Sequence, residues 1–317
     1  MRFFRLFGLA VLLSVLFMSA AFPEGLNPLP LDQFMAGPRL DKANFDKNNT
    51  HYEDESITVD IAYGKFKGVP YTTARIKIAD ASQLRTVSGR QARNPNDGAF
   101  GGNNGVATGK QICEAVNAVV GLNGDYCITE DKCKVMMRQC KQIRNRADGG
   151  FDVLIIDKNG DFTAIRRCTA DMYKEYYKAH KDEMYNVFCF GPVVVTEGHR
   201  TIGPLYQNRD IIAREKTQRA AIAQIGHLEY MLITSDGDAI GRTWGLTVMD
   251  FSELCETLGL EAAEGGFQLA FNLDGGNSAA LIYPQWDQNQ LSYAKLNMPD
   301  VGRPLSDMIC FFSLVGN

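Results

Sequence analysis

The chain has few histidines and no run of basic residues, the features that indicate metal binding or binding to nucleic acids and anionic membranes. It has only 4 histidines in 317 residues, and none stands in a His-x-x-x-His or comparable ligand spacing. We therefore expect no metal centre and no cofactor, although Asp and backbone oxygens alone can hold Ca²⁺. The chain also lacks a basic run and has a net charge of −4. That balance argues against nucleic acid or an anionic membrane surface as partners.

The first 21 residues have the features of a signal peptide. Arg2 and Arg5 precede an apolar run from Leu6 to Met18, and small residues at 19–21 offer a cleavage site after Ala21. The run is short for a bilayer span, so an uncleaved anchor is the weaker alternative. Removing the 2 leader arginines from 33 basic residues leaves 31 against 37 acidic ones, a net charge of −6. We expect a secreted, extracellular or periplasmic protein without stable membrane insertion.

All eight cysteines lie beyond the leader, and an even number in an exported chain predicts disulfide bonds. Their connectivity stays open. The spacing of Cys127, Cys133 and Cys140 does not match a zinc pattern of two cysteine pairs. Cys255 lies on the apolar stripe of an expected helix, where a buried free thiol is the alternative.

Hydrophobic patterns predict one main domain. Residues 22–55 are polar and rich in proline, which is typical of an irregular leader that wraps the body or stays mobile. Strand patterns cover 57–63 and 71–79, and paired strands with turn signals occupy 151–166 and 220–234. Helices are expected over 108–117 and from the N-cap Thr247 to a stop at Gly259. The fold class is thus α/β or α+β, a mixed, largely antiparallel sheet with interspersed helices, over 56–317.

The most informative motif is an apolar strand over 268–273 that runs directly into Asp274, Gly275 and Gly276. Two adjacent glycines allow positive φ and a close approach of the backbone to a ligand, and Ser278 adds a hydroxyl. The plainer interpretation is a tight turn in which Asp274 only caps the backbone.

A set of motifs in order resembles the phosphodiester glycosidase family over about residues 85 to 315. The family includes the domain of a lysosomal enzyme that removes N-acetylglucosamine from a sugar phosphodiester. This chain departs from it at Ala223, where the family usually has Gly, and at Asn277, often a third Gly. The matching motifs are Gly121-Leu122-Asn123-Gly124-Asp125-Tyr126, Phe190-Gly191-Pro192-Val193-Val194-Val195, Gln218-Arg219-Ala220-Ala221-Ile222-Ala223, Ser235-Asp236-Gly237, Trp244-Gly245-Leu246-Thr247 and Asn272-Leu273-Asp274-Gly275-Gly276-Asn277-Ser278.

Three expected strands end in polar, glycine-containing segments, which carry Asp125, Asp236 and Asp274. If these ends meet at one edge, the three carboxylates form a cleft suited to acid and base catalysis of glycoside hydrolysis. Ordinary turns at all three positions are the alternative. Arg219 is expected to clamp a phosphate, and Arg303 is a second candidate. The full set of expected substrate-binding residues is Asn123, Gly124, Arg219, Gly237, Asn272, Gly275, Gly276, Ser278 and Arg303.

The resemblance implies a secreted hydrolase that cleaves the glycosidic bond of a sugar 1-phosphodiester, acting on a small molecule or glycan with a sugar-phosphate linkage. Two alternatives stay open: a glycan-binding or cell-envelope module without turnover, and a phosphodiesterase that cuts the P–O bond.

Overall fold

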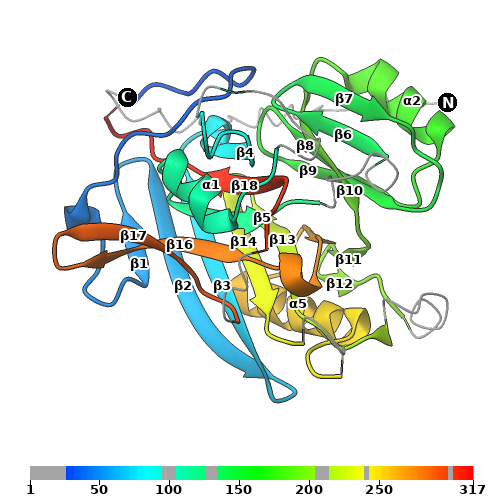
Figure 1. Ribbon diagram of the computed structural model, residues 1–317. Coiled ribbons are helices and arrows are strands. Elements are labelled where there is room, and N and C mark those ends of the chain that lie inside the picture. Colours follow the sequence, from blue (N-terminus) through cyan, green and yellow to red (C-terminus); the bar gives the residue numbers. More distant parts are fainter. Residues whose placement is uncertain are drawn as a thin grey trace, which may run out of the picture.

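Within the part of the chain that the structure describes, three antiparallel sheets and three α-helices make up the fold (Figure 1). The computed structural model describes residues 26–94, 97, 105–125, 134–203, 214–238, 243–298 and 303–316. The expected signal peptide, most of the Gly- and Asn-rich stretch 94–105, and Cys127 and Cys133 lie outside the described residues.

The largest sheet, sheet A, has eight strands in the order β1-β2-β3-β14-β13-β15-β11-β12. Every neighbouring pair is antiparallel. These strands are β1 (His51–Glu53), β2 (Ile57–Phe66), β3 (Val69–Ile78), β11 (Val193–Thr196), β12 (His199–Arg200), β13 (Arg219–Gly226), β14 (Glu229–Ser235) and β15 (Leu269–Asn272).

Two five-stranded sheets pack against the same side of sheet A. Sheet B, in the order β17-β16-β5-β18-β4, comprises β4 (Leu84–Ser88), β5 (Val120–Asn123), β16 (Leu281–Asp287), β17 (Gln290–Lys295) and β18 (Asp307–Phe311). Sheet D, in the order β7-β6-β10-β8-β9, comprises β6 (Val135–Arg138), β7 (Lys141–Asn145), β8 (Asp152–Asp157), β9 (Phe162–Ile165) and β10 (Met184–Phe190).

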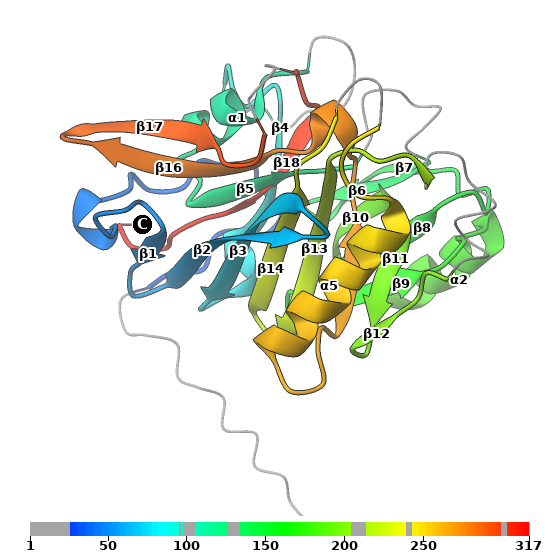
Figure 2. The same cartoon turned by 90° about the horizontal axis from the view of Figure 1, so that it is seen from below.

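The helices cover the outer faces of the sheets (Figure 2). Helix α5 (Val248–Ala262) packs on the outer face of sheet A, α1 (Gly109–Ala115) on sheet B and α2 (Ala170–His180) on sheet D. The main core lies between sheet A and the other two sheets, where Ile222 and Phe271 meet Leu122 of sheet B and Phe188 of sheet D. Residues of sheet A therefore alternate between this inner face and the α5 face.

Most of the expected elements are confirmed, with one correction at the end of α5. Strands β2 and β3, the hairpins β8–β9 and β13–β14, and α1 occur where the sequence predicts them. Thr247 caps α5 through the backbone N–H of Asp250. Gly259 does not stop this helix, which runs on to Ala262. A Cβ at Gly259 would lie 2.8 Å from the backbone nitrogen of Phe267, so close packing explains this glycine. Helix α2 was not anticipated.

The segment before β2 packs onto the body of the protein. Leu26, Leu29 and Leu40 are buried, and β1 adds a short edge strand to sheet A within the stretch expected to be irregular. No disulfide bond joins the described cysteines, at 113, 140, 168, 189, 255 and 310, in this structure, so the expected disulfide bonds stay a prediction. Cys255 is the buried thiol that its helical position allowed. None of the described helices has the length and apolar character needed to cross a membrane.

Candidate active site

A small recess lies where the ends of β5 and β15 and the start of β18 meet. Sheets A and B form it together, and a side chain from sheet D closes its floor. The lining residues are Asn123, Gly124, Asp125, Asp274, Ser278, Leu305, Ser306 and Asp307. Of the three carboxylates expected to share a cleft, Asp125 and Asp274 line this recess and Asp236 does not. Asn123, Gly124 and Ser278 also line it, and the functional roles of these residues stay predictions.

Asp274 lines the recess and is partly exposed. Ser278 and the backbone N–H of Gly275 donate hydrogen bonds to its carboxylate. Its backbone carbonyl accepts a hydrogen bond of 2.7 Å from Nδ2 of buried Asn123. Oδ1 of Asn123 accepts the backbone N–H of Ala280 at 3.0 Å. Asn123 thus holds the chain on both sides of the Asp-Gly-Gly motif.

Burial raises the pKa of Asp274 from 3.8 to about 6. The hydrogen bonds from Ser278 and Gly275 and the positive charge of Arg303 act in the opposite direction, while the nearby carboxylate of Asp125 adds to the increase. Arg303 is half-buried and has no hydrogen bond or salt bridge within the described part of the chain. The site therefore contains a carboxyl group that titrates near neutral pH beside a guanidinium able to bind an anion.

Asp125 belongs to a buried ion cluster. Its Oδ1 accepts a hydrogen bond of 2.7 Å from Nη2 of Arg138, and its Oδ2 accepts the backbone N–H of Cys189 at 2.8 Å. Nε of the same arginine donates to Oδ2 of Asp307 at 2.9 Å. The guanidinium of Arg138 lies 4.1 Å from the ring centroid of Phe188 and has no exposed surface. Because both carboxylate oxygens of Asp125 are engaged, this residue supplies fixed negative charge beside Asp274.

Asp236 and Gly237 do not line the recess. Strand β14, which precedes them, is separated from β15 by β13, about 9 to 10 Å in all. Oδ1 of Asp236 instead accepts the backbone N–H of Met298 at 2.9 Å. Gly237 packs on the backbone of Thr217, since a Cβ there would lie 2.4 Å from its carbonyl carbon. A catalytic role for Asp236 stays a prediction that this position does not favour.

Arg219 and Asn272 lie on the α5 side of sheet A, away from the recess. Along β13, Arg219 has the same parity as Ala221, which packs against α5, whereas Ala220 faces the inner core. The guanidinium of Arg219 donates to the carbonyls of Leu246 and Glu215 at 3.0 and 2.7 Å. Asn272 donates from Nδ2 to the carbonyl of Gly191 at 2.8 Å. Substrate contacts by either residue stay predictions.

Each glycine of the site occupies a position where a side chain would collide with a neighbour or where the backbone has a positive φ. A Cβ at Gly124 would lie 2.2 Å from Oδ1 of Asp307, and one at Gly275 would lie 2.7 Å from the carbonyl oxygen of Gln218. Gly276 has φ of 57°, which confirms the expectation of positive φ at one of the two motif glycines. Its N–H donates to the carbonyl of Gln218 at 2.9 Å. The motif is thus seated on the backbone of β13.

Sequence reasoning missed four residues of the recess and its floor, namely Arg138, Leu305, Ser306 and Asp307. Arg138 lies at the end of a short strand and Asp307 at the start of another, so neither stands in a glycine-rich motif. The only signal for them was a charged residue beside an apolar run. Within the described residues, no group of three or more His, Cys, Asp or Glu side chains is arranged to hold a metal ion.

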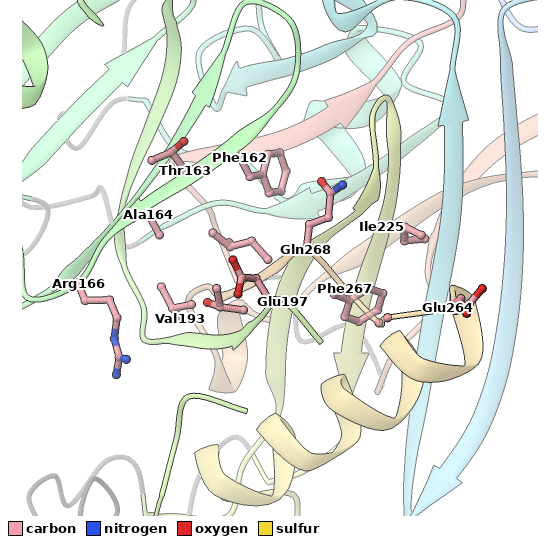
Figure 3. A pocket seen from close by; sticks show the side chains of 14 residues that line it. Phe162, Thr163, Ala164, Arg166, Val193, Glu197, Ile225, Glu264, Phe267 and Gln268 are labelled. Atoms are coloured by element: carbon pink, nitrogen blue, oxygen red, sulfur yellow. The ribbon is translucent and has the colours of Figure 1, made fainter. Parts of the chain in front are cut away.

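A larger open groove of about 700 Å³ lies at the other end of β15 (Figure 3). It runs between the edge strand β9 and the region where Gln268 enters β15. Phe162 and Gln268 extend into it, while Arg166 points away. None of the expected site residues lines this groove, so the small recess is the better candidate for chemistry.

Comparisons with known proteins bear on the fold and on the family. Among solved structures, the chain is similar to the catalytic domain of zebrafish N-acetylglucosamine-1-phosphodiester alpha-N-acetylglucosaminidase auto-inhibited by its pro-peptide. The TM-score is 0.56 at 14% identity, over 83% of this chain and 86% of that one. At this identity the likeness concerns the fold alone.

Two further solved structures are more distant. A hypothetical protein from Synechocystis has a TM-score of 0.46 and 14% identity, over 81% of this chain and 62% of that chain. A putative exported protein from Burkholderia pseudomallei K96243 has a TM-score of 0.43 and 12% identity, over 78% and 75%. No curated protein matches the sequence. The family model described as phosphodiester glycosidase matches residues 116–312, more than half of the chain, and the protein therefore belongs to the phosphodiester glycosidase family.

Proposed function

We propose that the protein is a hydrolase that cleaves the glycosidic C–O bond of a sugar 1-phosphodiester and releases free sugar and a phosphomonoester. The observation that carries the proposal is that Asp274, a carboxyl group of the recess with a pKa near 6, lies within electrostatic reach of the positive charge of Arg303. Glycoside hydrolysis needs a proton acceptor or donor of this kind, and a phosphodiester needs a cation beside its leaving oxygen.

Arg303, rather than Arg219, is the residue that we propose for holding the phosphate. It carries a positive charge close enough to lower the pKa of Asp274, whereas the Arg219 guanidinium is occupied by backbone carbonyls. As the bond between the anomeric carbon and the phosphate oxygen breaks, its electron pair leaves with the phosphate. The negative charge that gathers there strengthens the contact with Arg303.

Asp274 would act on the attacking water. The leaving phosphomonoester is a weak base and departs without prior protonation, so the more demanding task is to activate the nucleophile. The ionised carboxylate accepts the proton of a water whose oxygen bonds to the anomeric carbon, and a pKa near 6 suits that role near neutral pH. Asn123 and Ser278 fix the position of the carboxylate. Asp125 adds negative charge that favours the oxocarbenium-ion-like transition state of glycoside hydrolysis.

The name of the zebrafish relative indicates which substrates to test first, because that enzyme acts on N-acetylglucosamine 1-phosphodiesters. Purified protein should release free N-acetylglucosamine from UDP-N-acetylglucosamine or from a methyl phosphodiester of the sugar 1-phosphate. Hydrolysis in ¹⁸O-labelled water should place the label in the sugar. Label in the phosphate and release of sugar 1-phosphate would instead indicate a phosphodiesterase.

The assay also separates the proposal from a binding module. Absence of sugar release across a panel of sugar phosphodiesters, combined with saturable binding of the same compounds, would overturn the hydrolase proposal. Asn277 is the place to look for altered sugar preference, because it directly precedes Ser278, which lines the recess. Comparison of N-acetylglucosamine with glucose and galactose donors would show that preference.

We further propose that the chain is exported and cleaved after Ala21. The basic start, the apolar run and the small residues support this assignment. Intact mass of the protein recovered from the medium or periplasm of an expressing cell should correspond to a chain that begins at Phe22. Recovery of the full chain in the cytosol alone would contradict it.

A further inference from the structure

Two buried cysteines from distant parts of the sequence lie side by side where α1 packs on sheet B. Cys113 is on α1 and Cys310 is on β18, and their sulfurs are 3.9 Å apart although 197 positions separate them in the chain. Both side chains are fully buried. They pack over Gly121 of β5, where a Cβ would lie 2.5 Å from the sulfur of Cys113 and 3.3 Å from that of Cys310.

The surroundings of the pair do not suit a reactive thiolate. Burial and the contact with Cys113 raise the pKa of Cys310 well above its usual range. The neighbours are apolar, including Ile112, Met308 and Phe312, and supply no cation to stabilise a thiolate. A nucleophile or a metal-bound thiolate is therefore unfavourable here. What remains is a pair of neutral sulfurs in contact.

We propose that Cys113 and Cys310 form a disulfide bond in the exported protein and so join α1 to β18. The sulfurs are already in contact, and a side-chain rotation with a small backbone shift closes the remaining distance. The reaction breaks two S–H bonds and forms one S–S bond. The two protons and two electrons pass to the disulfide of a thiol-disulfide oxidoreductase or of oxidised glutathione, which becomes two thiols.

No other described pair has comparable geometry. Cys168 and Cys189 influence one another electrostatically, but the thiol of Cys168 donates to the carbonyl of Thr169 at 3.7 Å. Cys255 lies inside α5 among apolar side chains. Because both sulfurs of the proposed pair are fully enclosed, oxidation has to occur while the chain folds and the thiols are still accessible.

The position of the pair links it to the candidate active site. Cys310 is three residues after Asp307 on β18, and its strand neighbour Gly121 is two residues before Asn123 on β5. A covalent bond here would tie α1 to β18, the strand that carries the lining residue Asp307. The proposal itself does not depend on the hydrolase activity, because its test reads the bond directly.

The test is peptide mapping of the full chain produced through an oxidising secretory route. The protein is unfolded in the presence of a maleimide, digested without reduction and analysed by mass spectrometry. We expect a linked peptide pair that contains Cys113 and Cys310 and that disappears on reduction. Cys113→Ser should leave Cys310 free to react with the maleimide, whereas the control Cys255→Ser should leave the linked pair intact.

Thermal unfolding provides a second measurement. The thermal midpoint should fall by roughly 5 to 15 °C when a reductant is present during unfolding, as expected for a bond that closes a long loop. The same reductant should have little effect on Cys113→Ser. Maleimide labelling of both Cys113 and Cys310 in the secreted wild type, or linkage of either one to a different cysteine, would overturn the proposal even if the variants failed to fold.

Discussion

Asp274 combines a buried position with a charge that the proposed reaction needs. Asp274→Asn keeps the size of the side chain and removes the proton acceptor. We expect kcat to fall by at least about a hundredfold, the usual scale for loss of a positioned acid or base group. Sugar release from UDP-N-acetylglucosamine measures this. A variant within a few-fold of the wild type would return Asp274 to the role of a turn residue.

The pH dependence of stability offers a separate check on the same residue. Because the folded pKa of Asp274 is raised from 3.8 to about 6, its ionisation destabilises the fold. This cost is absent below pH 3.8, grows as the pH rises toward about 6 and stays constant above that. Asp274→Asn should therefore be more stable than wild type at pH 7 to 8, by about 1 kcal/mol after solvent screening. Urea unfolding at pH 4 and at pH 7 to 8 measures this difference in stability, which should vanish near pH 4.

Arg303 is expected to act on both the substrate and Asp274. Arg303→Gln removes the charge that lowers the pKa of Asp274, so the acid limb of the profile of kcat/KM against pH should move upward. KM should rise by roughly ten- to a hundredfold through loss of the phosphate contact. Arg303→Lys, the matched control, should leave the acid limb in place and weaken binding only partly. An unchanged pH profile in Arg303→Gln would show that Arg303 does not influence the titration of Asp274.

At the scale of single elements, the Asp-Gly-Gly segment owes its shape to β13. Gly275 has no room for a Cβ beside the carbonyl of Gln218, while Gly276 has room but a positive φ. We expect Gly276→Ala to cost about 1 kcal/mol of stability. Gly275→Ala should cost more, because its methyl group would collide with the carbonyl oxygen of Gln218. Urea unfolding of the two variants measures both.

A matched control for Gly276 is Gly68, in the β2–β3 turn, which has φ of 79° and open space around a Cβ. Gly68→Ala should lose similar stability and keep full specific activity. Gly276→Ala should lose activity as well, since its turn presents Asp274 and Ser278 to the recess. Equal specific activity in the two variants would limit the motif to a structural turn.

Elements whose signals are local were predictable from the sequence. The hairpin β13–β14 and helix α5 carry their turn and capping signals within a few residues. Helix α2 was missed because only one of its residues, Tyr173, is buried, so its apolar stripe is weak. The face of the sheet on which Arg219 lies could not be predicted from the sequence. The sequence placed it at a strand start, but strand parity turned it toward α5.

At the scale of the whole molecule, the recess could be predicted only in part. Asn123, Asp125 and Asp274 follow strand ends, so their polar character stood out. Asp236 has the same signal, but sheet order places it two strands from β15. The floor residues depend on contacts between sheets. Arg138 reaches Asp125 across 13 residues and Asp307 across 169, and no local pattern in the sequence encodes such a meeting.

Arg138 therefore connects sheet D to sheet B through buried ion pairs. It projects from sheet D and forms ion pairs with Asp125, which follows β5, and with Asp307 on β18, both strands of sheet B. Replacing it by Met keeps the bulk over Phe188 and leaves two buried carboxylates without their cation. We expect Arg138→Met to lose about 3 to 5 kcal/mol, measured by urea unfolding at pH 7. Lys67→Met, which removes an exposed ion pair with Asp250, should lose under about 1 kcal/mol.

The sign of the pH effect distinguishes this electrostatic explanation from simple loss of packing. In Arg138→Met, protonation of Asp125 and Asp307 removes the unbalanced charge, so the loss of stability relative to wild type should shrink as the pH is lowered toward about 4. A packing defect would persist at every pH. If the variant is too unstable to purify at neutral pH, its recovery and folded signal at acidic pH test the same point. A pH-independent loss would show that the arginine serves mainly as a filler between sheets B and D.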